Sequence, residues 1–270
     1  MRSITSRKLS IAIVALFVAA LLVPAIALAT TSLKLSGSTT VYPCAQVLAT
    51  QYHKRYPTVA VTVTGGGSGV GISDVLAGRV GIGMSSRDLK STEIASGAKA
   101  TAFAKDALTV IVNKGNPVAN LSEYQIRQIY LGKITNWKSV GGPNARIIIC
   151  GRTAASGTYE MFKEKFLLGS RQSSMTRQYA SNGMVRSAVY QNRYAIGYVG
   201  MAFVNTSIKA LKVGGVYPSR TNARSGTYKY VRNLYWVTKG TPAGTAKAFI
   251  NWTLTSTGQG YVDTQYLRIK

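Results

Sequence analysis

Two patterns of apolar and polar residues alternate along the chain. Short apolar, β-branched runs predict strands, which we place at residues 33–35, 59–64, 80–84, 107–112, 146–150, 194–199 and 234–237. Apolar residues three and four positions apart predict helices, which we expect to end near Tyr56, Gly78 and Leu131, to begin after Ser156, and to span 243–255. Ser122 is the expected N-cap of the helix that ends at Leu131. Strands that alternate with helices predict an α/β fold with mainly parallel sheets flanked by helices.

Four of the predicted strands run into turns rich in glycine, serine and threonine. These turns are 36–43 ("SGSTTVYP"), 65–72 ("GGGSGVGI"), 85–90 ("SSRDLK") and 151–158 ("GRTAASGT"). Ligands of open α/β sheets gather at the carboxyl ends of strands, so we expect the turns to meet at one crevice.

The fourth turn has the features of an anion site. Ser156 stands where an N-cap is expected, because Tyr159 and Phe162 follow at helical spacing. A helix start presents free N–H groups with a partial positive charge behind them, and Arg152 lies four residues upstream. Together with Arg87 in the third turn, these groups predict a site where hydroxyls, amides and guanidinium enclose an oxyanion.

Motifs for catalysis or cofactors are incomplete. A GxGxxG pattern fails at Val70 or Ile72, the P-loop ending is missing, and neither "GGGSG" nor "AASGT" fits the GxSxG elbow. His53 is the single histidine, which makes a transition-metal site improbable. Three carboxylates lie near the predicted crevice: Asp74, Asp88 and Asp106. We therefore expect binding without turnover, with no metal and no cofactor.

The charge of the chain is strongly positive. Thirty-three Lys and Arg stand against eight Asp and Glu, which gives a net charge of +25. The basic residues are spread out and no nucleic-acid motif accompanies them, so nucleic-acid binding is not expected. A basic protein that interacts with the cell envelope stays an alternative.

The first 30 residues have the features of an export signal. Arg2, Arg7 and Lys8 precede an apolar run from 11 to 29 that ends in Ala-Leu-Ala. This predicts an exported protein, extracellular, periplasmic or at the cell surface, with an uncleaved membrane anchor as the alternative.

Two further features suit an exported chain. Cys44 and Cys150 either form one disulfide or remain two buried thiols. Three sequons, at Asn120, Asn205 and Asn251, offer sites for glycans.

Six segments in order resemble the phosphate-binding protein of the phosphate ABC transporter, which has a type II periplasmic-binding-protein fold. The segments are "SGSTTVYP", "GGGSGVGI", "IGMSSR", "ARIIICGRTAASGTYEMF", "AIGYVGMAF" and "LYWVTKGTPAGTAKAFINW". The resemblance covers about residues 35 to 270.

The resemblance implies two lobes that close on one dehydrated phosphate, in a monomer that delivers it to permease subunits of an ABC transporter. Lobe one would be about 33–110 plus 230–270 and lobe two 111–229, with strands 107–112 and 234–237 as a two-strand hinge. The implied phosphate ligands are Ser38, Thr39, Thr40, Ser68, Gly69, Ser85, Ser86, Arg87, Arg152, Ser156, Gly157 and Thr158.

The third turn departs from the family pattern. Well-known bacterial members have Ala-Ser-Asp there, and the Asp accepts a hydrogen bond from protonated phosphate. This chain has Met84, Ser85 and Ser86, followed by Arg87 and Asp88. Asp88 either takes over as the acceptor or caps a helix that begins near Leu89. A receptor for sulfate, molybdate or another oxyanion is therefore the nearest alternative.

Overall fold

The computed structural model describes residues 31–269, which belong to one compact unit. The predicted signal peptide or anchor, residues 1–30, lies outside the described residues. None of the helices within residues 31–269 has the length and apolar character needed to cross a membrane.

Helices and strands alternate along most of the chain. The α-helices are α2 (Tyr42–Arg55), α3 (Ser68–Leu76), α4 (Ser91–Ala95), α5 (Glu123–Tyr130), α6 (Gly157–Lys165), α7 (Asn182–Gln191), α8 (Arg220–Arg224), α9 (Gly244–Thr253) and α10 (Ser256–Val262). The strands are β1 (Thr31–Gly37), β2 (Val59–Thr64), β3 (Ile82–Ser85), β4 (Ala98–Asn113), β5 (Asn120–Leu121), β6 (Ile148–Arg152), β7 (Arg177–Tyr179), β8 (Ala195–Gly200), β9 (Ile208–Ala210), β10 (Lys212–Val213), β11 (Val231–Lys239) and β12 (Leu267–Arg268). Two 3₁₀ helices are η1 (Trp137–Val140) and η2 (Met201–Phe203).

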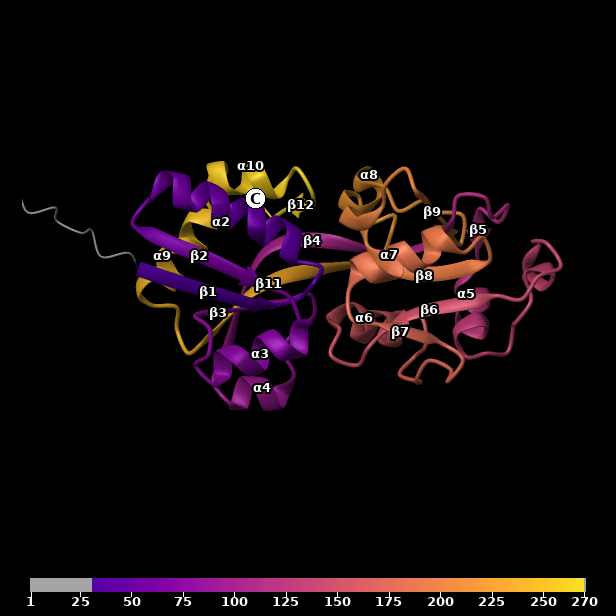
Figure 1. Ribbon diagram of the computed structural model, residues 1–270, viewed down its shortest axis with the longest axis horizontal. Helices are drawn as coiled ribbons and strands as arrows, with labels where there is room; N and C mark the ends of the chain where they lie inside the picture. The colour runs from indigo at the N-terminus through magenta and orange to yellow at the C-terminus, as the bar shows by residue number, and fades with distance from the viewer. Residues whose placement is uncertain (1–30, 270) are drawn as a thin grey trace, which may run out of the picture. The chain divides into compact units, whose positions relative to one another are not determined.

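The main sheet combines parallel and antiparallel pairs. Its order is β2-β1-β3-β11-β4-β8-β6-β7. Strands β1, β2 and β3 pair in parallel, as do β6, β7 and β8. Every antiparallel pair between named strands of the described chain includes β4 or β11. Figure 1 shows β4 and β11 passing between two groups of helices, with α2, α9 and α10 opposite α3 and α4 in one group.

Strands β4 and β11 are longer than the sequence pattern predicts. The apolar run 107–112 is only the second half of β4, whose first half contains Ala, Lys and Thr. Ala and Lys are poor strand formers, so this half carries no local signal. It forms because residues 98–107 pair with β11 and bury Phe103 and Ala104.

The hydrophobic core is divided where β4 and β11 cross. One cluster combines side chains from 33–104 with others from 234–266, and Phe103 stacks on Trp236 with ring centroids 4.0 Å apart. Another takes its side chains from 107–230 and Leu267, and Phe162 stacks on Tyr198 at 3.9 Å. The predicted lobe boundaries remain a prediction.

Element ends agree with the capping signals. Ser156 Oγ accepts from Tyr159 N at 3.2 Å, and Ser122 Oγ accepts from Gln125 N at 3.1 Å, so both are N-caps. Strand β6 begins at Ile148 rather than Arg146, because Arg146 forms an isolated bridge with Asn136. It runs on to Arg152, which therefore belongs to the strand rather than to the turn.

Candidate functional site

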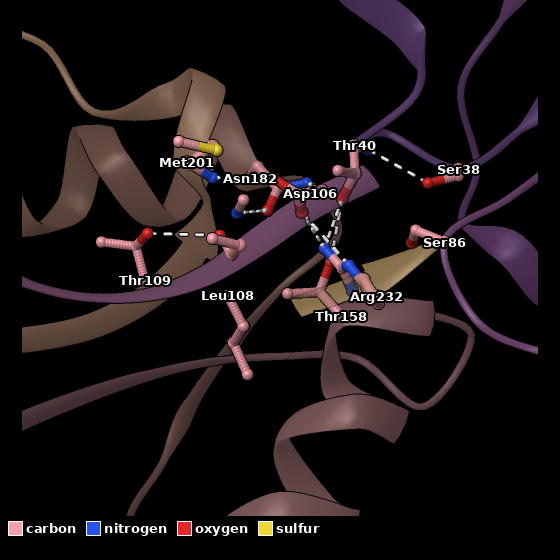
Figure 2. A network of polar contacts seen from close by, with 12 residues as sticks. Ser38, Thr40, Ser86, Asp106, Leu108, Thr109, Thr158, Asn182, Met201 and Arg232 are labelled. Carbon is pink, nitrogen blue, oxygen red and sulfur yellow. Dashed lines mark hydrogen bonds and ion pairs between the residues drawn. The ribbon is translucent and has the colours of Figure 1, made fainter. Parts of the chain in front are cut away.

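Three helix starts and the ends of their preceding strands meet at a cluster of hydroxyl groups. Ser38, directly after β1, accepts from the backbone N–H of Thr40 (3.2 Å) and of Val41 (3.3 Å). Thr40 Oγ1 lies 3.0 Å from Thr158 Oγ1 on α6 (Figure 2). Ser68, the first residue of α3, lies 3.3 Å from Ser86 through their Oγ atoms, and its Oγ also accepts from Ser86 N at 3.0 Å. All five hydroxyls are almost fully buried.

Glycines let the start of α6 approach this cluster. A Cβ on Gly157 would lie 2.4 Å from Ser68 Oγ and 2.8 Å from Ser86 Oγ. The backbone of Gly69 approaches the same segment, since its N–H donates to Ala155 O at 3.1 Å. Only a residue without a side chain fits at position 157 with these neighbours in place.

Arg152 contributes one buried guanidinium to the cluster and is 1% exposed. Its Nη2 donates to Thr39 Oγ1 (3.0 Å) and to Ala180 O (2.9 Å), and its Nε donates to Tyr179 O (3.1 Å). Its Nη1 is buried and has no partner among the described residues. Burial lowers the pKa of Arg152 to about 10; Tyr198 opposes this shift and Arg232 adds to it.

Arg232 brings a second guanidinium. It faces Asp106 across the β4–β11 pair, and its Nε and Nη2 donate to Asp106 Oδ2 at 3.1 and 2.7 Å (Figure 2). Its Nη2 also reaches Thr158 Oγ1 at 3.1 Å and Thr40 Oγ1 at 3.3 Å. Within residues 31–269, no acceptor lies within reach of its buried Nη1.

The cluster holds more positive than negative charge. Burial raises the pKa of Asp106 above its ordinary value, against the pull of Arg232 and the N–H of Met201. Protonation would leave a buried guanidinium without a counter-charge, so the carboxylate stays ionised at neutral pH. Asp106 balances the charge of Arg232, while Arg152 forms no ion pair within residues 31–269. The free Nη1 groups of both arginines can donate to an anion.

The structure brings together most of the predicted site residues: Ser38, Thr39, Thr40, Ser68, Gly69, Ser86, Arg152, Gly157 and Thr158. The hydroxyls of Ser85 and Ser156 serve local turns. Ser85 Oγ donates to Arg87 O at 2.7 Å, and Ser156 caps α6. That the predicted site residues, including Ser85 and Ser156, bind a ligand stays a prediction.

Arg87 and Asp88 have partners outside the hydroxyl cluster. Arg87 donates from Nη1 and Nη2 to the two carboxylate oxygens of Glu93, at 2.8 and 2.7 Å. Asp88 accepts from the hydroxyl of Tyr235. The alternative that Asp88 caps a helix beginning near Leu89 is wrong, because α4 begins only at Ser91 and Glu93 takes part in its capping box.

Sequence reasoning missed Arg232 and Asn182. Asn182 Nδ2 donates to Thr39 and Thr40 at 3.1 and 3.0 Å, and its Oδ1 accepts from Gly200 N at 3.2 Å. No sequence pattern marks it. Arg232 did carry a signal, because it shares the inward face of β11 with Leu234 and Trp236 at a spacing of two.

Asp74 supports the neighbouring turn rather than the cluster. A hydrogen bond from Ser36 Oγ at 2.6 Å lowers the pKa of the Asp74 carboxyl, Arg79 lowers it further, and desolvation opposes both. The carboxylate therefore contributes stability above the ordinary Asp pKa, and this stability is lost as pH falls through the lower folded-state value.

We expect Asp74→Asn to lower the free energy of unfolding at neutral pH by about 1–2 kcal/mol, because it removes a charged acceptor. The difference from wild type should shrink as pH falls below 3.8, where the unfolded carboxyl becomes protonated before the folded one, whose pKa is lower. Urea denaturation across pH measures both, with Glu164→Gln, an exposed carboxylate, as control. A difference that is constant with pH would contradict the role of the charge.

The structure also bears on the predictions for the cysteines, the histidine and the sequons. Cys44 and Cys150 are free and buried, so no disulfide joins them. His53 is a surface residue whose Nδ1 lies 2.8 Å from Val59 O. The sequon asparagines Asn120, Asn205 and Asn251 are exposed. The part of the chain that the structure describes contains no group of His, Cys, Asp and Glu suited to a metal.

Comparison with known proteins shows the family to which this fold belongs. The family model described as the PBP superfamily domain matches residues 24–257. The chain belongs to the PBP superfamily. A structure from Clostridium perfringens, described as a phosphate ABC transporter substrate-binding protein with bound phosphate, is 35% identical with a TM-score of 0.85; the match covers 89% of this chain and all of that one. The predicted α/β periplasmic-binding-protein fold is therefore confirmed.

Two curated relatives of this PBP superfamily member share a name. The phosphate-binding protein PstS of Borreliella burgdorferi is 35% identical over 87% of this chain and 89% of its own length. The protein of the same name from Bacillus subtilis is 29% identical over 88% of this chain and 82% of its own length.

Proposed function

We propose that this chain is an exported receptor that captures inorganic phosphate and delivers it to the permease subunits of an ABC transporter. The observation that carries the proposal is the pair of buried guanidiniums, Arg152 and Arg232, each with an unpartnered Nη1, of which only Arg232 is paired with a carboxylate, that of Asp106. Hydroxyl groups surround them on several sides. The names of the curated relatives and the phosphate bound in the Clostridium perfringens structure give independent support.

Affinity would come from charge-assisted hydrogen bonds in a site closed to water. We propose Arg152, Arg232, Thr39, Thr40 and Thr158 as principal ligands, with further donors from Ser38, Ser68, Ser86 and the amides at the start of α6. Arg87 is a weaker candidate, because Glu93 already engages both ends of its guanidinium.

Capture would involve the closing of two lobes, 33–110 plus 230–270 and 111–229. The core divides near residues 104–107 and 230–234, within a few residues of this boundary, which supports it. Thr40 and Thr158 come from different proposed lobes and touch, as do Ser68 and the start of α6. An anion held from both sides favours the closed state, because only that state offers all of its contacts.

The decisive test is calorimetric titration of the purified protein, freed of bound anion, with phosphate, sulfate and molybdate in turn. We expect tight binding of phosphate with one ion per chain. Tighter binding of sulfate or molybdate would make this a receptor for another oxyanion. If none of the three binds, the proposal is wrong.

We expect Gly157→Ala to weaken phosphate binding by roughly 5- to 150-fold, the equivalent of about 1–3 kcal/mol for overpacking. The added methyl group would meet Ser68 and Ser86 only when α6 reaches them, so the thermal stability of the phosphate-free protein should change little.

Gly183→Ala is the matched control for this substitution. It also lies in the first turn of a helix, but its Cβ would meet nothing nearer than Ser181 Oγ at 3.8 Å. Equal phosphate affinities in the two variants would mean that α6 does not close on the cluster.

A further inference from the structure

A large groove adjoins the buried cluster. It encloses a cavity of about 1010 Å³, and its walls come from the segment before α4, from β4, from α6 and from residues 223–233. Ser86 and Arg232, both members of the cluster, also line it. The groove is therefore continuous with the side chains that we propose as phosphate ligands, yet it is far larger than one phosphate ion requires.

Basic side chains dominate this groove. Eight Lys and Arg residues line it against three carboxylates. Two of these carboxylates are engaged by lysines of the groove itself: Glu160 with Lys90 at 3.6 Å, and Glu164 with Lys165 at 2.7 Å. The third, Asp88, accepts from Tyr235.

Two lysines of the groove have no counter-charge of their own. Lys105 on β4 is exposed, and Lys163 on α6 is half-buried. Neither forms an ion pair with any residue in the range 31–269, which the structure describes. They lie on different elements of the groove wall, so both would attract an anion inside the groove.

We propose that the groove is an entry vestibule, a weak second site for small oxyanions that gathers phosphate outside the buried cluster and sets its rate of capture. This proposal rests on the proposed function, since the buried cluster is the destination. A cleft whose lining carries an excess of one sign of charge focuses the field and raises the local concentration of the opposite ion. Arg232, which is 8% exposed and lines both spaces, marks the point of transfer.

Lysines of an entry vestibule should affect the rate of phosphate association, whereas a residue that binds phosphate directly should affect its dissociation. We expect Lys105→Gln/Lys163→Gln to lower the association rate constant of phosphate about tenfold at low salt, the lower end of the range for electrostatic steering. The dissociation rate constant should not change, because neither lysine forms a hydrogen bond or an ion pair with the cluster. The difference in association rate should fade as salt screens the lysines.

Stopped-flow tryptophan fluorescence, with phosphate mixed at several ionic strengths, measures both rate constants. Lys54→Gln/Lys138→Gln is the matched control, since it removes the same charge from exposed lysines that do not line the groove. Equal association rates in the two double variants would overturn the vestibule but leave the receptor function intact. A change in the dissociation rate constant alone would have the same consequence. Failure of the wild-type protein to bind phosphate would overturn both.

Discussion

Arg152→Met is expected to weaken phosphate binding by about 2–5 kcal/mol, the usual cost of deleting one partner of a buried, charge-assisted contact. This corresponds to roughly 30- to 5,000-fold in the dissociation constant. The buried guanidinium has a free Nη1 and three hydrogen bonds that hold it in place, so its geometry is set before the anion arrives. Calorimetric titration with phosphate measures the loss.

The phosphate-free variant should remain folded. Arg152→Met loses three hydrogen bonds but also removes a buried charge, and the lowered pKa indicates that burial disfavours that charge, so the melting temperature should change little. Phosphate should raise the melting temperature of the wild-type protein and have little effect on the variant. Arg171→Met, which removes an exposed charge, serves as control. Wild-type affinity in Arg152→Met would exclude this arginine from the site.

Asp106→Asn is expected to lower the free energy of unfolding by about 3–5 kcal/mol, because it leaves Arg232 buried without a counter-charge. Asp106 is fully buried, and its pair with Arg232 has an N–O distance of 2.7 Å. Guanidinium denaturation followed by circular dichroism measures the change. Asp263→Asn breaks pairs with Arg220 and Arg224 that are partly exposed, so it should cost at most about 1 kcal/mol.

A double variant separates stability from binding. Asp106→Leu/Arg232→Met replaces the buried ion pair with apolar side chains, and should recover most of the stability lost in Asp106→Asn. It should still bind phosphate weakly, because one of the two guanidiniums is gone. Strong phosphate binding by this double variant would show that Arg232 serves the fold and not the ligand.

The local parts of the fold could be predicted because they follow from short-range chemistry. Ser122 and Ser156 were recognisable as N-caps from the apolar spacing that follows them, and the structure has both. The convergence of the turns followed from parallel strands ending at one edge. The first half of β4 could not be predicted, since partners in β11, more than a hundred residues away, stabilise it.

The candidate site was predictable where its chemistry lies in or directly beside the turns rich in glycine, serine and threonine, and not elsewhere. Arg152 was found because it stands beside a helix start. Arg232 was overlooked because its strand was recognised only from residue 234 on, which left the arginine outside the alternation that shows it facing inward. For Arg87, the sequence could not show that Glu93 would take both ends of its guanidinium.

The two unpaired cysteines have a practical consequence for handling the protein. Burial raises the pKa of Cys44 to about 12 and that of Cys150 to about 11, so very little reactive thiolate is present at neutral pH. No covalent cross-link holds residues 31–269 together. The chain should therefore fold equally well with or without reductant, need no disulfide-forming oxidoreductase, and resist alkylating reagents while it is native.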